Sequence, residues 1–331
     1  MARKSNRREF FQGAGIAASG LIMAAAPLAA APAPAARPAA RSMGTRFREL
    51  MNGPEPLICS NAYDLLTARL GEVHGYKGVF VGSSGANQEL VSVPDQALVS
   101  VSELIEYAGV IARNVNVPIV ADLDDLGATA INVYRFAKMA EQVGIACAAF
   151  DDRMPINRAS AYTVPGVMPV ARMVDNIHAA ADARSDMVLV ARCLAPAPNG
   201  SYTEMLDRSA AYAEAGADLI WVGMRTLDDY AKAAAMLKKP LFGVIGNANI
   251  PATVEGMKSA HFTVGQAGPV VNIALGAVDR ALTEMKATGR MTEAQKTALP
   301  RATADKVYQV QELNARALKY NVPAASGGPE P

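Results

Sequence analysis

The sequence predicts an α/β fold, specifically a (β/α)8 barrel of the TIM type, from three observations. From residue 56 onward the chain repeats one unit: a short apolar run, a loop, an amphipathic stretch with helical spacing, and a Gly or Pro. Eight such units follow one another without a second class of composition, which favours a closed parallel barrel over an open sheet. The chain has 331 residues, 51% of them hydrophobic and 19% charged, and this length accommodates a barrel of about 250 residues.

The expected strands are apolar runs rich in Val, Ile and Phe, which are typical of strands buried on both faces. They span Leu57–Ser60, Gly78–Gly82, Ile119–Leu123, Ile145–Phe150, Met187–Cys193, Leu219–Gly223, Leu241–Gly246 and Phe262–Gln266. Residues 130–143 form an expected helix, and Gly144 and Gly216 follow helices at points where a left-handed backbone is needed. Two further amphipathic stretches, residues 268–288 and about 301–319, exceed the needs of one barrel. We expect these extra C-terminal helices to pack on a neighbouring subunit or to cover the lower face of the barrel.

Residues 1–40 are expected to be an export signal with an Ala/Pro-rich linker. A basic start, an uncharged Ala-rich stretch over residues 12–36 and the paired Arg7 and Arg8 favour the twin-arginine route. A membrane anchor is the alternative, but a stretch made mostly of Ala, Gly and Pro favours export without stable membrane insertion. The sequence thus predicts a periplasmic or otherwise exported protein. Its single barrel domain would cover residues 41–320, followed by a flexible tail over 321–331.

Charge and cysteine content restrict the possible partners. Residues 41–331 carry 27 Lys and Arg against 30 Asp and Glu, a net charge of −3, and no basic patch with interleaved aromatics occurs. Nucleic acid is therefore not expected as a partner. Cys59, Cys147 and Cys193 are odd in number and lack a C-x-x-C spacing, which favours buried thiols over disulfides. The three histidines are assigned structural roles, so a Ser-His-Asp or Cys-His mechanism is not expected.

Two acidic clusters stand at the ends of neighbouring predicted strands. Asp122, Asp124 and Asp125 follow the third strand, and Asp151 and Asp152 follow the fourth. Catalytic groups of parallel α/β folds gather where the carboxyl ends of the strands meet, so these five carboxylates are expected to converge. Hard oxygen ligands of this kind favour Mg²⁺ or Mn²⁺.

Structural roles are open for the same residues. Asp151–Asp152 could form ion pairs with Arg153 or Arg158, and Asp124–Asp125 could cap the next helix. Arg192, at the end of the fifth strand, could bind an anionic substrate bidentately or pair with the acidic clusters.

Small residues follow the second predicted strand. Residues 82–87 read Gly-Ser-Ser-Gly-Ala-Asn, and their backbone N–H groups and hydroxyls could hold a carboxylate or phosphate, although an ordinary tight turn has the same composition. Asp95 lies in the loop beyond them, where it could approach the site or cap a helix.

From about Pro56 to Gly289 the chain resembles the isocitrate lyase and phosphoenolpyruvate mutase superfamily. The resemblance rests on ordered segments: Asn61-Ala62-Tyr63-Asp64, Thr67-Ala68-Arg69-Leu70, Gly82-Ser83-Ser84-Gly85, Pro94-Asp95, Ala121-Asp122-Leu123-Asp124, Asp151-Asp152 and Ala191-Arg192. This order is specific for the superfamily but not for one activity within it. It implies a barrel whose last helix is exchanged between subunits, usually in a tetramer, and a small anionic carboxylic acid as substrate.

The resemblance also implies roles for individual residues. The implied substrate-binding residues lie at the strand ends: Tyr63, Ser83, Ser84, Gly85 and Arg192. Three carboxylates would position Mg²⁺, partly through water: Asp122, Asp124 and Asp151. Asp95 would lie close to the reacting group.

Three departures from the family pattern bear on the activity. Members that cleave isocitrate or methylisocitrate carry a Lys-x-Cys-Gly-His loop after the fourth strand, whereas residues 154–162 here contain no Cys, Lys or His. The usual Thr-Gly-Tyr-Gly turn is replaced by Asp-Leu-Gly-Ala at residues 125–128, and no acidic residue occurs in residues 193–195 after the arginine. Isocitrate cleavage is therefore not expected.

The leading expectation is a Mg²⁺-dependent lyase-type enzyme that breaks or forms a C–C bond in a small 2-oxo or 2-hydroxy acid through a metal-stabilised enolate. Asp95, Tyr162 or a metal-bound water could move the proton, and Arg192 completes the expected catalytic set. Phosphonate-type C–P chemistry and a non-catalytic, exported carboxylate-binding protein are the alternatives.

Overall fold

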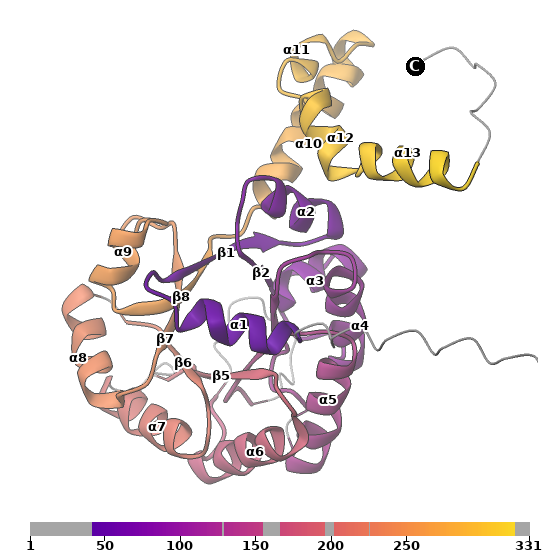
Figure 1. The fold of residues 1–331 in the computed structure, drawn as a ribbon. Coiled ribbons are helices and arrows are strands. Elements are labelled where there is room, and N and C mark those ends of the chain that lie inside the picture. The colour runs from indigo at the N-terminus through magenta and orange to yellow at the C-terminus, as the bar shows by residue number, and fades with distance from the viewer. Residues whose placement is uncertain (1–41, 128, 155–165, 196–201, 225, 322–331) are drawn as a thin grey trace, which may run out of the picture. The chain divides into compact units, whose positions relative to one another are not determined.

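The computed structural model describes residues 42–127, 129–154, 166–195, 202–224 and 226–321. The expected export signal and the tail beyond residue 321 lie outside these residues. Within them, eight parallel strands follow one another in chain order, and β8 pairs with β1 to close the barrel (Figure 1). The predicted (β/α)8 fold is confirmed.

Each predicted strand is present, with bounds shifted by one or two residues. The strands are β1 Leu57–Ala62, β2 Gly78–Val81, β3 Ile119–Asp122, β4 Cys147–Asp151, β5 Val188–Cys193, β6 Leu219–Val222, β7 Leu241–Ile245 and β8 Phe262–Ala267. Because the barrel interior covers one face of most strands and the helices cover the other, their apolar runs are nearly continuous.

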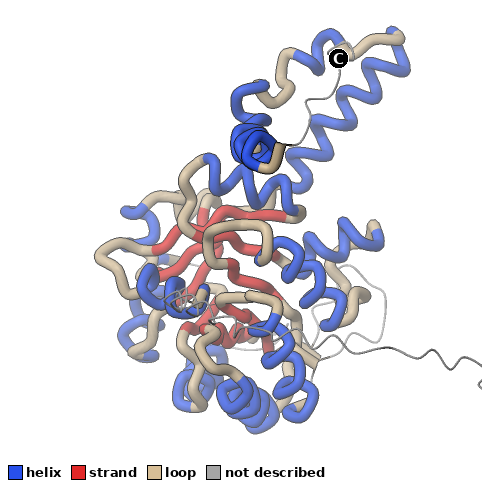
Figure 2. Tube along the Cα trace, turned by 45° about the vertical axis from the view of Figure 1, so that its right-hand side comes forward, coloured by secondary structure: helices blue, strands red, loops and turns tan. Residues whose placement is uncertain are grey.

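Helices surround the strands (Figure 2). Those of the barrel are α2 Leu65–Val73, α3 Ser83–Val91, α4 Val101–Ala112, α5 Ala130–Gln142, α6 Val170–Ala183, α7 Tyr202–Glu214, α8 Leu227–Leu237 and α9 Val254–Ser259. In α5, Val133, Ala137 and Ala140 are buried at helical spacing, so one stripe faces the sheet. Gly144 and Gly216 follow α5 and α7 with φ of +96° and +110°, the left-handed backbone expected there.

The barrel interior is a packed aromatic and aliphatic core. The ring centroids of Phe80 and Trp221 lie 5.8 Å apart, and those of Trp221 and Phe242 lie 4.8 Å apart. Phe80 belongs to β2 and Trp221 to β6, which are not neighbours in the sheet, so this contact crosses the interior. The three cysteines are buried free thiols, as expected.

A helix that the sequence did not predict, α1 (Met43–Met51), lies across one end of the barrel (Figure 1). Phe47 of α1 is fully buried in the same core cluster as Leu57 at the start of β1. Helix α1 therefore closes the amino-terminal end of the barrel, where extra C-terminal helices were one expectation.

A half-buried carboxylate ties α1 to the strands. Asp218 accepts hydrogen bonds from Nη1 of Arg48 at 2.9 Å, from the backbone N–H of Leu189 at 2.9 Å and from Arg184. Burial acts to raise the pKa of Asp218, but these hydrogen bonds outweigh it and hold the pKa below its usual value.

The C-terminal helices are α10 Val271–Thr288, α11 Thr292–Gln295, α12 Arg301–Val307 and α13 Val310–Lys319. The expected helix over residues 301–319 is in fact two helices, because Gln309 takes a left-handed φ of +57° between them. Helix α12 packs against α2 and buries Val307. Among the described residues, no helix combines the length and the apolar character needed to cross a membrane.

Replacing Asp218 by Asn should destabilise the protein by about 2 kcal/mol at pH 7, since Arg48 and Arg184 lose their charged partner. A lowered pKa means that the stabilisation is complete above the unfolded value of about 4 and disappears as the pH falls through the folded value. Urea unfolding of wild type and D218N from pH 3 to 8 should therefore show a gap that closes in acid. D175N, at an exposed position of α6, is the control; a gap that is constant with pH would contradict the assignment.

Candidate functional site

Charged side chains meet at the carboxyl ends of β3, β4 and β5. Side chains alternate along a strand, so Asp122 follows Val120 on the inner face, Asp151 follows Ala149, and Arg192 follows Val190. Asp151 is level with Arg192 in the β4–β5 register. Nη1 of Arg192 lies 3.6 Å from Oδ2 of Asp122. The prediction that these three residues share one site is consistent with this geometry.

Trp221, the single tryptophan of the chain, supports Arg192 from below. The guanidinium carbon of Arg192 lies 4.1 Å from the ring centroid of Trp221. Cation–π stacking and the ion pair with Asp122 hold the side chain in one orientation while leaving it about a quarter exposed. Arg192 therefore has the ion pair that the sequence left open, and its substrate-binding role stays a prediction. Trp221 was not predicted as a site residue, although the alternation of side chains along the sixth strand places it on the inner face of the barrel.

Asp124 returns toward the barrel from a strained turn. Its φ is +51°, that of Leu126 is also +51°, and both are left-handed values that side-chain-bearing residues rarely adopt. The turn is held because the Asp124 carbonyl accepts the N–H of Asp151 at 2.8 Å. The Ser83 hydroxyl acts to lower the pKa of the Asp124 carboxyl against the effect of burial. Within the described part of the chain, Oδ1 of Asp124 is buried without a hydrogen bond.

The other two acidic residues do not join this group. Asp152 faces outward, where it accepts a hydrogen bond from Tyr212 at 2.8 Å and from the N–H of Leu194 at 2.8 Å. Asp125 accepts the N–H of Gly127 and does not cap α5, whose N-cap is Thr129. Three of the five carboxylates expected to converge therefore do so. Asp152 points to the opposite face because consecutive residues of a strand alternate, and Asp125 lies in the turn with Gly127.

Arg153 pairs with two of the three inner carboxylates. Its Nε lies 3.0 and 2.9 Å from the two oxygens of Asp151, and its Nη2 lies 2.9 Å from Oδ2 of the same residue. Its Nη1 lies 3.4 Å from Oδ1 of Asp124. The ion pair considered from the sequence between Asp151 and Arg153 is therefore present, whereas Arg158 lies outside the described residues.

The charge balance tests whether a divalent cation suits this site. Burial raises the pKa of Asp122 and of Asp124, and neighbouring carboxylates raise both further, so the site holds more negative charge than it can easily stabilise. Hard oxygen donors fit Mg²⁺ or Mn²⁺, and among them Oδ1 of Asp124 is buried with an ion pair to Arg153 but no hydrogen bond within the described residues. In the arrangement with Arg153 between the carboxylates, the described residues contain no group of three ligands set for a metal. The carboxylate oxygens are thus the right type of ligand for a divalent cation, but their positions beside Arg153 do not form a complete coordination shell.

The remaining predicted residues lie around this group, except for one. Ser83, Ser84 and Gly85 form the first turn of α3, whose N–H groups have no partners within the helix. Gly85 is needed there because a Cβ would come within 3.2 Å of the Cβ of Tyr63. Asp95 is exposed, yet its charge contributes to the raised pKa of Asp122. Tyr162 lies outside the described residues.

Comparisons with known proteins agree with the barrel fold. A family model described as phosphoenolpyruvate phosphomutase matches residues 47–286. The 2-methylisocitrate lyase of Shewanella oneidensis is 30% identical over 204 residues, which are 61% of this chain and 70% of that protein. An oxaloacetate decarboxylase of Pseudomonas putida is 31% identical over 207 residues, 62% and 71% of the two chains. The structure of an oxaloacetate acetylhydrolase with the inhibitor 3,3-difluorooxalacetate has a TM-score of 0.77 and 25% identity, covering 86% of this chain and 99% of that one.

Buried carboxylates with raised pKa values make a prediction about metal-free stability. Between about pH 4 and neutrality the folded protein binds more protons than the unfolded chain, so the free energy of unfolding should fall as pH rises. Replacing Asp124 by Asn removes one of these groups, which should flatten the slope by up to about 1.4 kcal/mol per pH unit. Urea unfolding in the presence of EDTA measures both slopes, and parallel curves for wild type and D124N would refute the assignment.

Proposed function

The chain belongs to the isocitrate lyase and phosphoenolpyruvate mutase superfamily, and on this premise we propose that it is a Mg²⁺-dependent lyase-type enzyme that breaks or forms a C–C bond next to a carboxylate in a small 2-oxo or 2-hydroxy acid. The observation that carries the proposal is the group of three buried carboxylates opposite Arg192 at the catalytic end of the barrel. Relatives named 2-methylisocitrate lyase and oxaloacetate decarboxylase support C–C chemistry.

Each residue of the site has a part in this proposal. Asp122, Asp124 and Asp151 would hold the cation, which would supply Lewis-acid stabilisation of the negative charge that develops when a bond beside a carboxylate breaks. Arg192, fixed on Trp221, binds one anionic end of the substrate. The first turn of α3 offers backbone N–H groups to a second carboxylate.

The missing acid–base loop favours 2-oxo acids within this class. Cleaving a 2-hydroxy acid requires a base to remove the hydroxyl proton, and residues 154–162 contain no Cys, Lys or His for this purpose. A 2-oxo acid that carries a second carboxylate on C3 can lose that carboxylate as carbon dioxide without such a base, because the electrons of the broken C–C bond pass to the C2 carbonyl and water can protonate the resulting enolate. Asp95 and Tyr162 are the proposed proton carriers where one is needed.

The basic N-terminus with Arg7 and Arg8 supports export through the twin-arginine route to the periplasm, and this location is part of the proposal.

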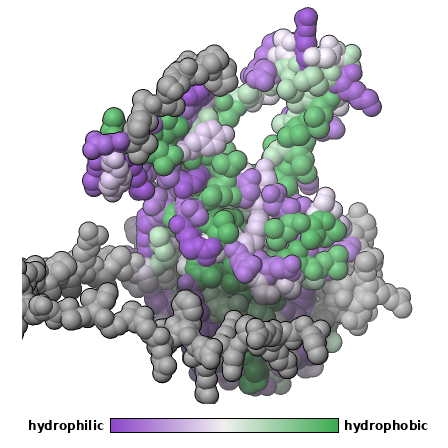
Figure 3. All heavy atoms as spheres, turned by 90° about the vertical axis from the view of Figure 1, so that its right-hand side faces the viewer, coloured by the Kyte–Doolittle hydropathy of each residue, from purple (hydrophilic) through white to green (hydrophobic). Residues whose placement is uncertain are grey.

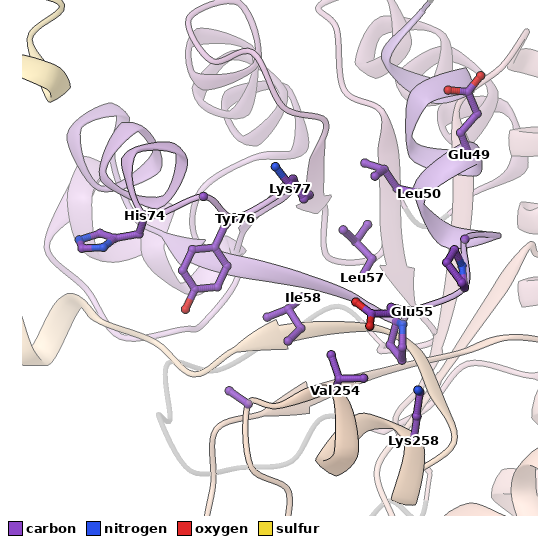
Figure 4. Close-up of a pocket in the computed structure, with 15 residues that line it drawn as sticks. Glu49, Leu50, Glu55, Leu57, Ile58, His74, Tyr76, Lys77, Val254 and Lys258 are labelled. Atoms are coloured by element: carbon purple, nitrogen blue, oxygen red, sulfur yellow. The ribbon is translucent and has the colours of Figure 1, made fainter.

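A second copy of the chain is proposed to complete the barrel's outer layer. A groove of about 840 Å³ near the amino-terminal end is lined by apolar residues such as Leu50, Ile58 and Val254 together with charged residues such as Glu55 and Lys258 (Figure 4). Helix α10 follows β8, yet within the described part of the chain none of its residues is buried. Apolar side chains lie exposed along one stripe of this helix: Leu275, Val278, Leu282 and Met285. Hydrophobic residues gather along the C-terminal helices in Figure 3.

We therefore propose that α10 of one subunit covers this groove of another, as in the expected helix exchange and tetramer. Leu275 is 57% and Leu282 is 63% exposed, and both would be buried in such an assembly. The double substitution L275D/L282D should convert the oligomer to a folded monomer in light scattering. I131D is the matched control, because Ile131 is 82% exposed on α5; a monomeric wild type would reject this part of the proposal.

The activity is tested by screening purified protein against 2-oxo acids, hydroxy-dicarboxylates and phosphonates, with Mg²⁺ and with EDTA. Turnover should require Mg²⁺, and D124N should lower kcat/KM by at least about 100-fold because the transition-state charge loses its stabilising partner. Circular dichroism should show an unchanged fold.

Three outcomes would contradict the proposal of a Mg²⁺-dependent C–C lyase. Full turnover by D124N, or by wild-type protein in EDTA, would show that the reaction does not depend on the metal. A product containing phosphorus would point to C–P chemistry, for which the phosphomutase family model is the supporting observation. Stoichiometric binding without conversion would identify a carboxylate-binding protein.

A further inference from the structure

Arg153 lies among the carboxylates that are proposed to hold the metal. Its side chain is almost fully buried, with 7% exposure of the residue. It contacts both oxygens of Asp151 and comes within 3.4 Å of Asp124, two of the three carboxylates assigned to the metal. Its backbone N–H also donates to Asp151 at 3.1 Å. The guanidinium thus provides the opposite charge that the buried carboxylates require.

The backbone that carries Arg153 is fixed. Arg153 forms an antiparallel bridge with Val167, the N–H of Met154 donates to Gly166 at 2.7 Å, and the N–H of Met168 donates to Asp152 at 2.7 Å. Asp152 is itself anchored by Tyr212. A change in the position of the guanidinium must therefore come from rotation of the side chain.

We propose that Arg153 is a built-in counter-cation that competes with the divalent metal for Asp151 and Asp124, so that metal binding requires the Arg153 side chain to leave these oxygens. The inference rests on the proposed function, because it concerns the same carboxylates. A carboxylate oxygen directed at a guanidinium cannot at the same time coordinate a metal ion in the same direction, and two cations in one buried site repel each other.

Removal of the guanidinium should therefore strengthen metal binding. Titration calorimetry of MgCl₂ into metal-free protein at pH 8 should show at least tenfold tighter binding to R153Q than to wild type. R153K keeps the charge but loses the planar fork that engages both Asp151 oxygens, so its affinity should lie between the two. MnCl₂ serves as a second probe.

Arg208→Gln is the matched control. Arg208 is a half-buried arginine at this end of the barrel, and its Nη1 lies 3.7 Å from Oδ2 of the outward-facing Asp152. Its other contacts are to Glu204, Tyr212 and the Met168 carbonyl, none of which is a proposed metal ligand, so R208Q should bind Mg²⁺ with wild-type affinity.

Thermal unfolding gives an independent measure. Metal-free R153Q should unfold at a lower temperature than wild type, because its carboxylates have lost their counter-charge, and Mg²⁺ should raise its midpoint more than that of wild type. Loss of stability that is equal with and without Mg²⁺ would show that Arg153 is purely structural and would overturn the inference.

The outcomes separate this inference from the proposed function. If wild type binds Mg²⁺ and R153Q and R153K bind it equally or more weakly, the inference fails and the metal-dependent function stands. If none of the four proteins binds Mg²⁺ or Mn²⁺, the metal-dependent function fails and the inference fails with it. R153K retains a cation at this position, so it preserves the test if R153Q does not fold.

Discussion

The need to neutralise three buried carboxylates at one end of the barrel governs the arrangement of the site. An unpaired carboxylate in a protein interior costs several kcal/mol, and Asp122, Asp124 and Asp151 lie within reach of one another's charge. Arg192 approaches the first, and Arg153 approaches the other two. Two guanidinium groups face three carboxylates, so the cluster keeps one uncompensated negative charge. Burial and the repulsion from neighbouring carboxylates therefore both raise the pKa of Asp124.

The barrel separates this costly cluster from the contacts that hold the fold together. At the amino-terminal end, Phe47 of α1 fills the base of the core, and Asp218 gathers Arg48 and Arg184 into a network that lowers its own pKa. The two ends therefore have carboxylates shifted in opposite directions: hydrogen bonds favour the ionised form at the base, and burial disfavours it at the mouth. This is the division of labour expected of a (β/α)8 enzyme, with stability at one face and chemistry at the other.

Much of this could be predicted from the sequence, because apolar runs of strand length and glycines after helices are local signals. The same signals placed Asp122, Asp151 and Arg192 at strand ends. What failed was side-chain direction: Asp152 was grouped with Asp151, although neighbouring residues of a strand face opposite sides. Two other features were beyond local patterns. The left-handed Gln309 divides an amphipathic stretch that reads as one helix, and α1 is defined by its tertiary contacts with the barrel base.

The permanence of the arginine charge determines how such a site can change state. A guanidinium does not lose its proton at any pH at which the protein is folded, so Arg153 cannot be switched off by titration, whereas the carboxylates with raised pKa values can. The backbone of residues 152–154 is also held by residues 166–168. Rotation of one side chain therefore remains as the motion that exposes the oxygens of Asp151. In such a site, the position of the Arg153 side chain, rather than the pH, determines whether the oxygens of Asp151 are free to bind a metal ion.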